Sequence, residues 1–254
     1  MQGRFDGKVV IVTGSTSGIG REAAIRFARE GASVVIAARR EAQGNAVVEE
    51  IEKSSGEALF VRTDVADAVS VEAMVAATVA RYGRLDCAFN NAGISGDTTK
   101  RTADHSKENW DAVIAANLTG VWLSMKYEIP VMLKNGGGSI VNTSSGYGLM
   151  RSDIGHVPYA VSKHGVIALT KTAAYEYAKR GLRINAVCPG WTHSEMVDPG
   201  LETNEKFRSF VHGQIPMGRV GDASEIADAV LWLCSNEASY VTGHAMCVDG
   251  GIIG

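Results

Sequence analysis

The amino-acid sequence predicts an α/β fold in which one doubly wound parallel sheet carries helices on both faces. Short apolar runs rich in valine and isoleucine alternate with longer helical patterns over most of the chain. Strands that are apolar on both sides and are separated by helices belong to a parallel sheet that is covered on both faces. No linker rich in proline or serine, no repeat and no change of composition divides the chain. We therefore expect one domain over residues 1–254.

Each element has a local reason in the sequence. Strands are expected at the short runs rich in β-branched residues, at 8–13, 33–38, 58–63, 85–90, 139–144 and 183–188, with a last strand near 245–251. Helices are expected where apolar residues recur at helical spacing, at about 18–30, 41–54, 70–83 and 108–133, around Tyr159, and at 222–234.

The stretch at about 193–218 interrupts this alternation after the strand at 183–188. In doubly wound folds, ligands bind beyond the carboxyl ends of the strands. An insertion at this point would hang over that crevice, so we predict a substrate lid.

The composition is that of an ordinary soluble protein, with 45% hydrophobic and 21% charged residues. A net charge of -3 leaves no basic stripe for a nucleic acid. No apolar run approaches the roughly 20 residues that cross a bilayer, and the N-terminus lacks the apolar stretch of a signal peptide. We expect a cytoplasmic protein with neither a nucleic-acid partner nor a membrane partner.

The four cysteines, Cys87, Cys188, Cys234 and Cys247, stand apart in apolar surroundings with no C-x-x-C pair. They are predicted to be buried thiols rather than zinc ligands or disulfides. No metal site is expected.

A glycine-rich turn follows the first expected strand, in VVIVTGSTSGIGREAA. Glycine lets a pyrophosphate approach the amides that open the next helix, where the helix dipole favours negative charge. A plain glycine-rich turn is the alternative, but the position between strand and helix favours a dinucleotide site. Its expected residues are Gly14, Ser17, Gly18, Ile19 and Gly20.

The end of the second expected strand distinguishes two dinucleotides. An NAD site places an acidic side chain there, whereas an NADP site supplies an arginine. Here VVIAARR puts Ala38 in the place of the acid, followed by Arg39 and Arg40. Because guanidinium groups bind phosphate, the sequence predicts NADP(H) rather than NAD(H). Arg39 is the first choice because it comes first after the strand.

The stretch HVPYAVSKHG holds Tyr159 and Lys163 four residues apart, just after a proline that suits the first turn of a helix. Residues i and i+4 share a face, so the phenol and the ammonium point the same way. Taken alone, a ring packed against a lysine stem is the commoner meaning of this spacing.

Motifs spread in order over nearly the whole chain resemble those of the short-chain dehydrogenase/reductase family. They are TGSTSGIG, NNAG at 90–93, NLTG at 117–120, NTSS at 142–145, YAVSK at 159–163, RINAVCPG at 183–190 and the closing DGG. No single motif suffices, but the ordered set is highly specific. The resemblance implies a Rossmann fold and an oxidoreductase.

Carried over by position, the resemblance implies Asn117, Ser145, Tyr159 and Lys163 as catalytic residues. It implies further cofactor contacts from Asp64, Val65, Asn91, Ala92, Gly93, Pro189, Gly190, Thr192 and Ser194, and from Tyr159 and Lys163 themselves. Fourteen positions separate Ser145 from Tyr159, one more than is usual in the family. Ser144 therefore stays an alternative to Ser145.

The expected reaction is hydride transfer between NADP(H) and a ketone or secondary alcohol, with Tyr159 as the general acid or base. Lys163 would favour the phenolate and bind the nicotinamide ribose, and Ser145 would bond the substrate oxygen where negative charge develops. By resemblance, Asn117 would hold a water that links Lys163 to solvent. A bond from its side chain to neighbouring backbone is an equal alternative. The expected pocket for a small carbonyl or alcohol comprises Ser95, Tyr147, His156 and Trp191.

Two other functions stay open. One is reduction of 3-oxoacyl thioesters on acyl carrier protein, although those enzymes usually carry arginines where this chain has Gly136 and Tyr175. The other is a non-catalytic NADP(H)-binding sensor or scaffold, which would not need all four catalytic residue types. The resemblance also implies a homotetramer. The apolar stretch AMCVDGGIIG fits a surface covered by a partner subunit and a buried last strand almost equally well.

Overall fold

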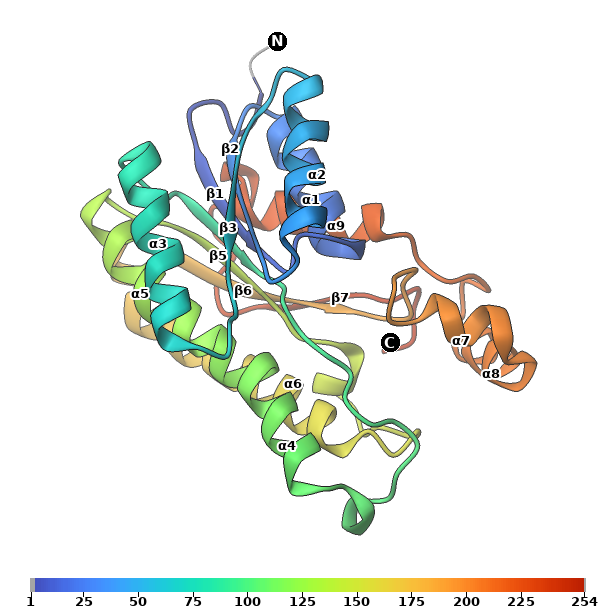
Figure 1. Cartoon of the computed structure of the whole chain (residues 1–254). Coiled ribbons are helices and arrows are strands. Elements are labelled where there is room, and N and C mark those ends of the chain that lie inside the picture. Colours follow the sequence, from blue (N-terminus) through green and yellow to red (C-terminus); the bar gives the residue numbers. More distant parts are fainter. Residues whose placement is uncertain (1–2, 254) are drawn as a thin grey trace.

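A seven-stranded parallel sheet forms the centre of the computed structural model, which describes residues 3–253 (Figure 1). The strands are β1 (Val9–Thr13), β2 (Ser33–Ala38), β3 (Glu57–Arg62), β4 (Cys87–Asn90), β5 (Gly138–Thr143), β6 (Leu182–Pro189) and β7 (Ala245–Val248). Their order across the sheet is β3-β2-β1-β4-β5-β6-β7, and every neighbouring pair is parallel. The predicted fold class is confirmed.

Helices cover both faces of this sheet (Figure 1). One face carries α1 (Gly18–Arg29), α2 (Glu41–Lys53) and α9 (Ala223–Cys234). The other carries α3 (Ala68–Tyr82), α5 (Gly120–Lys134) and α6 (Val157–Tyr177), with α4 (Lys107–Ile114) packed beside α6. The two remaining helices, α7 (Asp198–Thr203) and α8 (Glu205–Gln214), project beyond the sheet on the side away from α3 and α5.

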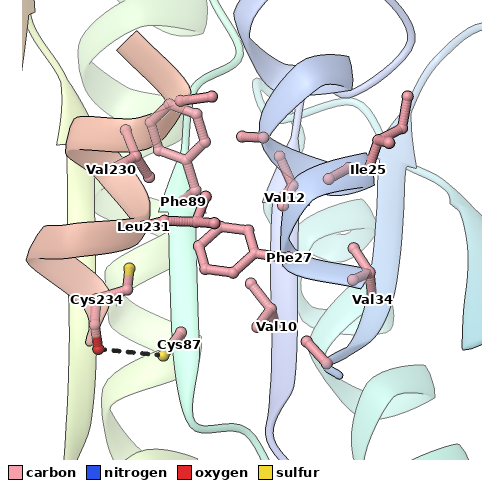
Figure 2. Close-up of a cluster of buried hydrophobic side chains, with 14 of the residues drawn as sticks. Val10, Val12, Ile25, Phe27, Val34, Cys87, Phe89, Val230, Leu231 and Cys234 are labelled. Atoms are coloured by element: carbon pink, nitrogen blue, oxygen red, sulfur yellow. Dashed lines mark hydrogen bonds between the residues drawn. The ribbon is translucent and has the colours of Figure 1, made fainter. Parts of the chain in front are cut away.

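The strands are buried on both faces because their side chains alternate between two apolar layers. On β1, Val10 and Val12 pack toward α1 and α9, whereas Ile11 belongs to the opposite layer. Figure 2 shows the first layer, in which Phe27 of α1 and Leu231 of α9 meet over the strands. This double burial fixes the position of the strand ends that carry the site.

The helix expected at 108–133 is interrupted. A π turn at Ala115–Thr119 joins α4 to α5, so this turn, which contains Asn117, is wider than the α-helical turns on either side. Such a turn breaks the regular side-chain spacing locally and is frequent at functional sites. The apolar pattern of the sequence does not reveal it.

The cysteine prediction needs a correction. Cys87, Cys188 and Cys234 are buried, but Cys247 is only half-buried because it lies on β7 at the edge of the sheet. The thiols are also not isolated in space. Cys87 Sγ donates to the carbonyl oxygen of Cys234 at 3.8 Å (Figure 2), and Cys188 and Cys247 are register partners on β6 and β7.

The strand order reverses between β1 and β4, since the chain leaves β1 toward β2 and later returns to the other side of β1. Ligands of open α/β sheets bind in the crevice at this reversal. A ligand is therefore expected to contact the residues that directly follow β1, β4, β5 and β6. Within residues 3–253, no helix has the length and apolarity needed to span a membrane.

Candidate active site

Tyr159 and Lys163 lie together on α6, next to the carboxyl end of β5. Lys163 Nζ donates to the carbonyl oxygen of Thr143, the last residue of β5, at 2.7 Å. The same nitrogen lies 5.4 Å from the centroid of the Tyr159 ring. The helical spacing thus brings the phenol and the ammonium together, as the sequence predicts.

Burial sets the protonation of both groups. Lys163 is 3% exposed, and its removal from water lowers its pKa to about 8. Burial also raises the pKa of Tyr159. A hydrogen bond with the Ser145 hydroxyl lowers this pKa, but by less than burial raises it. At neutral pH the phenol therefore holds its proton, while most of the lysine is still charged.

Ser144 and Ser145 have different surroundings. Ser144 is buried, and its hydroxyl donates to the carbonyl oxygen of Lys163 at 2.9 Å. Ser145 is half-buried and hydrogen-bonds with the Tyr159 phenol, while its Oγ accepts from the backbone N–H of Tyr147 at 3.2 Å. Of the two hydroxyls, Ser145 is therefore the one beside the phenol.

Asn117 is fully buried in the π turn, and its side chain is bonded to backbone. Its Oδ1 accepts from the Ile94 N–H at 2.8 Å, and its Nδ2 donates to the Ile94 carbonyl at 2.9 Å. A Cβ on Gly93 would lie 3.2 Å from Asn117 Oδ1 and 3.7 Å from Lys163 Nζ. Asn117 thus fixes the chain after β4 next to the lysine.

The glycine-rich turn joins β1 to α1 with little space to spare. Gly14 has a φ of +66°, and a Cβ there would come within 2.8 Å of Ala92 Cα. Asn91 donates from Nδ2 to the carbonyls of Thr13 and Gly14, so it holds the ends of β1 and β4 together. Ser17, the N-cap of α1, makes no side-chain cap, and the first helical turn has no acid. The first amides of α1 are therefore free to bind an anion.

Arg39 and Arg40 follow β2 at the same edge, and both are exposed. Arg40 donates from Nη2 to Thr16 Oγ1 at 2.9 Å and to Ser17 Oγ at 3.0 Å. The Arg39 side chain makes no hydrogen bond or ion pair in the described part of the chain. The second arginine therefore reaches the glycine loop, although the sequence favours the first.

The other residues expected at the cofactor follow β3 and β6. Asp64 and Val65 lie just beyond β3, where a Cβ on Gly120 would come within 2.9 Å of Val65. Pro189 ends β6, and a Cβ on Gly190 would come within 2.7 Å of Asp249. After it, Ser194 Oγ donates to the Thr192 carbonyl at 3.2 Å.

An aromatic row leads away from Tyr159. The His156 ring stacks on Tyr159 with centroids 4.5 Å apart, and its Nε2 lies 2.6 Å from the Ser95 carbonyl. Tyr147 packs edge-on against both His156 and Trp191. All four residues predicted for the pocket are therefore linked.

The row continues into the predicted lid through residues that the sequence analysis missed. Trp191 packs edge-on against Phe207 and Phe210 of α8. Gln214 accepts from Trp191 Nε1 at 2.9 Å and donates to Asp153 at 2.6 Å. The two phenylalanines carry a weak sequence signal as apolar positions of a polar helix. Asp153 and Gln214 carry none.

A cavity of about 710 Å³ lies beside α7 and α8, but it holds no predicted catalytic residue. Its lining is mostly charged and includes His193, Asp198, Arg208 and His212. Tyr159, Lys163 and Ser145 do not line this cavity.

Comparisons with known proteins agree with this geometry. A family model described as Enoyl-(Acyl carrier protein) reductase matches residues 14–253. The A-factor type gamma-butyrolactone 1'-reductase (1S-forming) of Streptomyces virginiae is 42% identical over 253 residues, which cover 98% of this chain and 97% of the relative. A 3-oxoacyl-acyl-carrier-protein reductase of Thermotoga maritima is 40% identical over 250 residues, which cover 98% of this chain and 99% of that protein. The crystal structure of a levodione reductase matches with a TM-score of 0.91 at 38% identity, over 97% of this chain and 98% of its own.

Proposed function

Because the chain belongs to the short-chain dehydrogenase/reductase family, we propose that it transfers a hydride between NADP(H) and a small ketone or secondary alcohol. The observation that carries this proposal is the grouping of Tyr159, Lys163 and Ser145 at the carboxyl edge of the sheet, beside the glycine loop. These residues supply a proton donor, a buried cation and a hydroxyl for the reacting oxygen.

The residues at the strand ends fit a nicotinamide dinucleotide. The uncapped start of α1 offers backbone amides to the pyrophosphate, and Gly14 and Gly18 adopt the positive φ that the tight turn requires. When bound, the nicotinamide ring gives or accepts the hydride. Lys163 would bind the ribose hydroxyls next to that ring.

The end of β2 supports NADP(H) over NAD(H). The strand itself does not end in the acidic residue that bonds the ribose in an NAD site, since Ala38 ends it and two arginines follow. Arg40 already lies over the hydroxyls of the glycine loop, and Arg39 is free to meet the 2'-phosphate.

Proton transfer is the task of Tyr159. For reduction, the phenol gives its proton to the carbonyl oxygen while the Ser145 hydroxyl donates a hydrogen bond to the same oxygen. For oxidation, the phenol must first be deprotonated, and each unit by which its pKa falls requires about 1.4 kcal/mol of preferential stabilisation of the phenolate. The Lys163 ammonium supplies part of this through its charge.

The aromatic row suits an apolar carbonyl compound. Tyr147, His156 and Trp191 would form one wall of the pocket, and the segment at 193–218 would close over it as a lid. The names of two relatives are those of reductases acting on a butyrolactone and on levodione.

A 3-oxoacyl thioester on acyl carrier protein is the second candidate substrate. The name of the Thermotoga maritima relative favours it. The name of the matching family model shares the acyl carrier protein but refers to an enoyl chain instead of a 3-oxoacyl chain. The surface favours it less, because Gly136 and Tyr175 stand where carrier-binding arginines are expected. A non-catalytic sensor is a weaker alternative, since the complete set of catalytic residue types is retained.

We also propose a homotetramer. Trp122 on α5 and Val161 on α6 are 47% and 43% exposed, and β7 leaves one edge of the sheet unpaired. Large exposed apolar side chains and open strand edges are typical of surfaces that a partner covers.

Absorbance of reduced nicotinamide tests the proposed function directly. Purified protein is mixed with NADPH or NADH and a panel of ketones, diketones and an acetoacetyl thioester. Ketone-dependent oxidation of NADPH, faster than of NADH, is the expected result. Turnover confined to the thioester would favour the acyl-carrier alternative, and cofactor binding without any turnover would favour the sensor.

A further inference from the structure

Glu195, in the segment between β6 and α7, holds the glycine loop by its carboxylate. Its Oε2 accepts from Ser17 Oγ at 2.9 Å and from Arg40 Nη2 at 3.0 Å, and its Oε1 accepts from Arg40 Nη1 at 3.3 Å. The Arg40 hydrogen bond keeps the pKa of Glu195 below its ordinary value. The side chain is therefore an anion at neutral pH.

The contact joins the start of the predicted lid to the predicted phosphate site. Ser17 is the N-cap of α1, and Arg40 also donates to Thr16 in the same loop. A Cβ on Gly18 would lie 3.4 Å from Ser194 Cβ, so residues 194 and 195 cross directly over the turn. None of the site roles predicted from the sequence involves Glu195.

The donors that hold this carboxylate are those that recognise phosphate. A guanidinium fork binds two oxygens of either anion, and a hydroxyl beside a helix N-terminus adds a third donor. Because a carboxylate and a phosphate repel each other, the two anions cannot share these donors at full strength.

On the basis of the proposed function, we propose that Glu195 occupies the place of a dinucleotide phosphate and that the cofactor displaces it. Glu195 then weakens cofactor binding and holds the base of the lid until the cofactor arrives.

The expected effect is modest, because Arg40 and Glu195 are 43% and 62% exposed and water screens them. Exposed ion pairs of this kind contribute little, so removing the competing carboxylate should tighten cofactor binding roughly two- to fivefold. The gain should shrink as salt concentration rises.

The test compares the dissociation constants of NADPH and NADH, without any carbonyl substrate, for the whole chain and for Glu195→Gln. Quenching of tryptophan fluorescence or titration calorimetry gives the constants. Glu202→Gln is the matched control, since this exposed lid carboxylate lies outside the glycine loop and makes no side-chain ion pair within residues 3–253.

A gain for NADPH alone would support displacement by the 2'-phosphate, and an equal gain for both dinucleotides would support displacement by the pyrophosphate. Unchanged or weaker binding by Glu195→Gln, or the same gain in Glu202→Gln, would overturn the inference and leave the proposed function intact. Failure of both the unmodified chain and the variant to bind either dinucleotide would overturn the proposed function as well.

Discussion

Ser144 and Ser145 have different surroundings, because the Ser144 hydroxyl bonds to the backbone of α6 and the Ser145 hydroxyl bonds to Tyr159. The buried Ser144 hydroxyl fixes the start of α6 by donating to the Lys163 carbonyl. Gly148 packs against it so closely that a Cβ there would come within 2.3 Å of Ser144 Oγ. Ser145 is therefore the hydroxyl that we propose for the substrate oxygen.

Substitution of each serine separates these roles. Ser145→Ala should lower kcat roughly 100- to 1,000-fold, because a donor to the developing oxyanion is lost. Ser144→Ala should keep most of kcat and lose about 0.5–1.5 kcal/mol of stability, because a buried side-chain hydrogen bond to the Lys163 carbonyl is lost. Steady-state kinetics and thermal unfolding of both variants measure this. The reverse pattern would assign the catalytic role to Ser144.

The predictable part of the site is the part that regular geometry fixes. The spacing of Tyr159 and Lys163 on a helix determines that they share a face, and the position of Gly14 after a strand determines that it begins the turn. The contacts of Glu195 and Gln214 depend on how the segment between β6 and α9 folds back over the sheet, which no local pattern specifies. The reach of Arg40 depends likewise on the extended backbone before α2.

At the scale of elements, α5 packs on β4 through a buried carboxyl group. Glu128 is fully buried, and its Oε2 accepts from Asn90 Nδ2 at 3.0 Å. Within the described residues, Glu128 Oε1 and Asn90 Oδ1 have no partner. Burial raises the pKa of Glu128 to about 7, so the carboxyl group holds its proton below neutral pH and loses it as the pH rises through 7.

This carboxyl group should make stability depend on pH. Because the folded-state pKa of about 7 exceeds the unfolded value of 4.5, the folded chain binds more protons in that window. The free energy of unfolding should therefore fall as pH rises from 4.5 to 7, by roughly 3 kcal/mol for a difference of about 2.5 units. Glu128→Gln, which stays neutral, should lose less stability over this range.

Thermal unfolding of both proteins between pH 5 and pH 8.5 measures the effect. The melting temperature of Glu128→Gln should decline by several degrees less than that of the unmodified protein. Parallel pH profiles would show that the carboxyl group is not responsible.

Gln214 links the proposed lid to the proposed pocket by hydrogen bonds. This side chain bonds both Trp191 and Asp153, and Tyr147 OH donates to the same aspartate at 3.0 Å. Gln214→Ala should loosen the pocket wall and raise KM for a ketone about fivefold, while the Kd of NADPH stays the same. Lys206→Ala, an exposed change on the same helix, is the control. An equal change of Kd would place the lid contact at the cofactor instead.

At the scale of the whole molecule, the parallel sheet was predictable because every central strand is apolar on both sides. The edges were less predictable. The cysteine on β7 is half-buried because that strand has a neighbour on one side only, which depends on strand order and not on the local sequence. The π turn likewise places Asn117 against Ile94, and this contact joins residues 23 positions apart in the sequence.

Assembly should depend on the exposed face of α5 and α6. Trp122→Glu would place a charge in the proposed subunit contact and should convert the proposed tetramer to smaller species. Val69→Glu, on the exposed side of α3, should leave assembly unchanged. Analytical ultracentrifugation distinguishes the two. An intact tetramer in Trp122→Glu would exclude this face as a contact.

The proposed function depends above all on Tyr159, which would exchange the proton in the hydride-transfer reaction. The most direct measurement is NADPH oxidation with a responsive ketone by the unmodified protein and by Tyr159→Phe, together with the Kd of NADPH for each. We predict that Tyr159→Phe binds NADPH within about twofold of the unmodified protein and loses at least roughly 100-fold in kcat. Turnover by Tyr159→Phe at an undiminished rate would contradict the proposed mechanism.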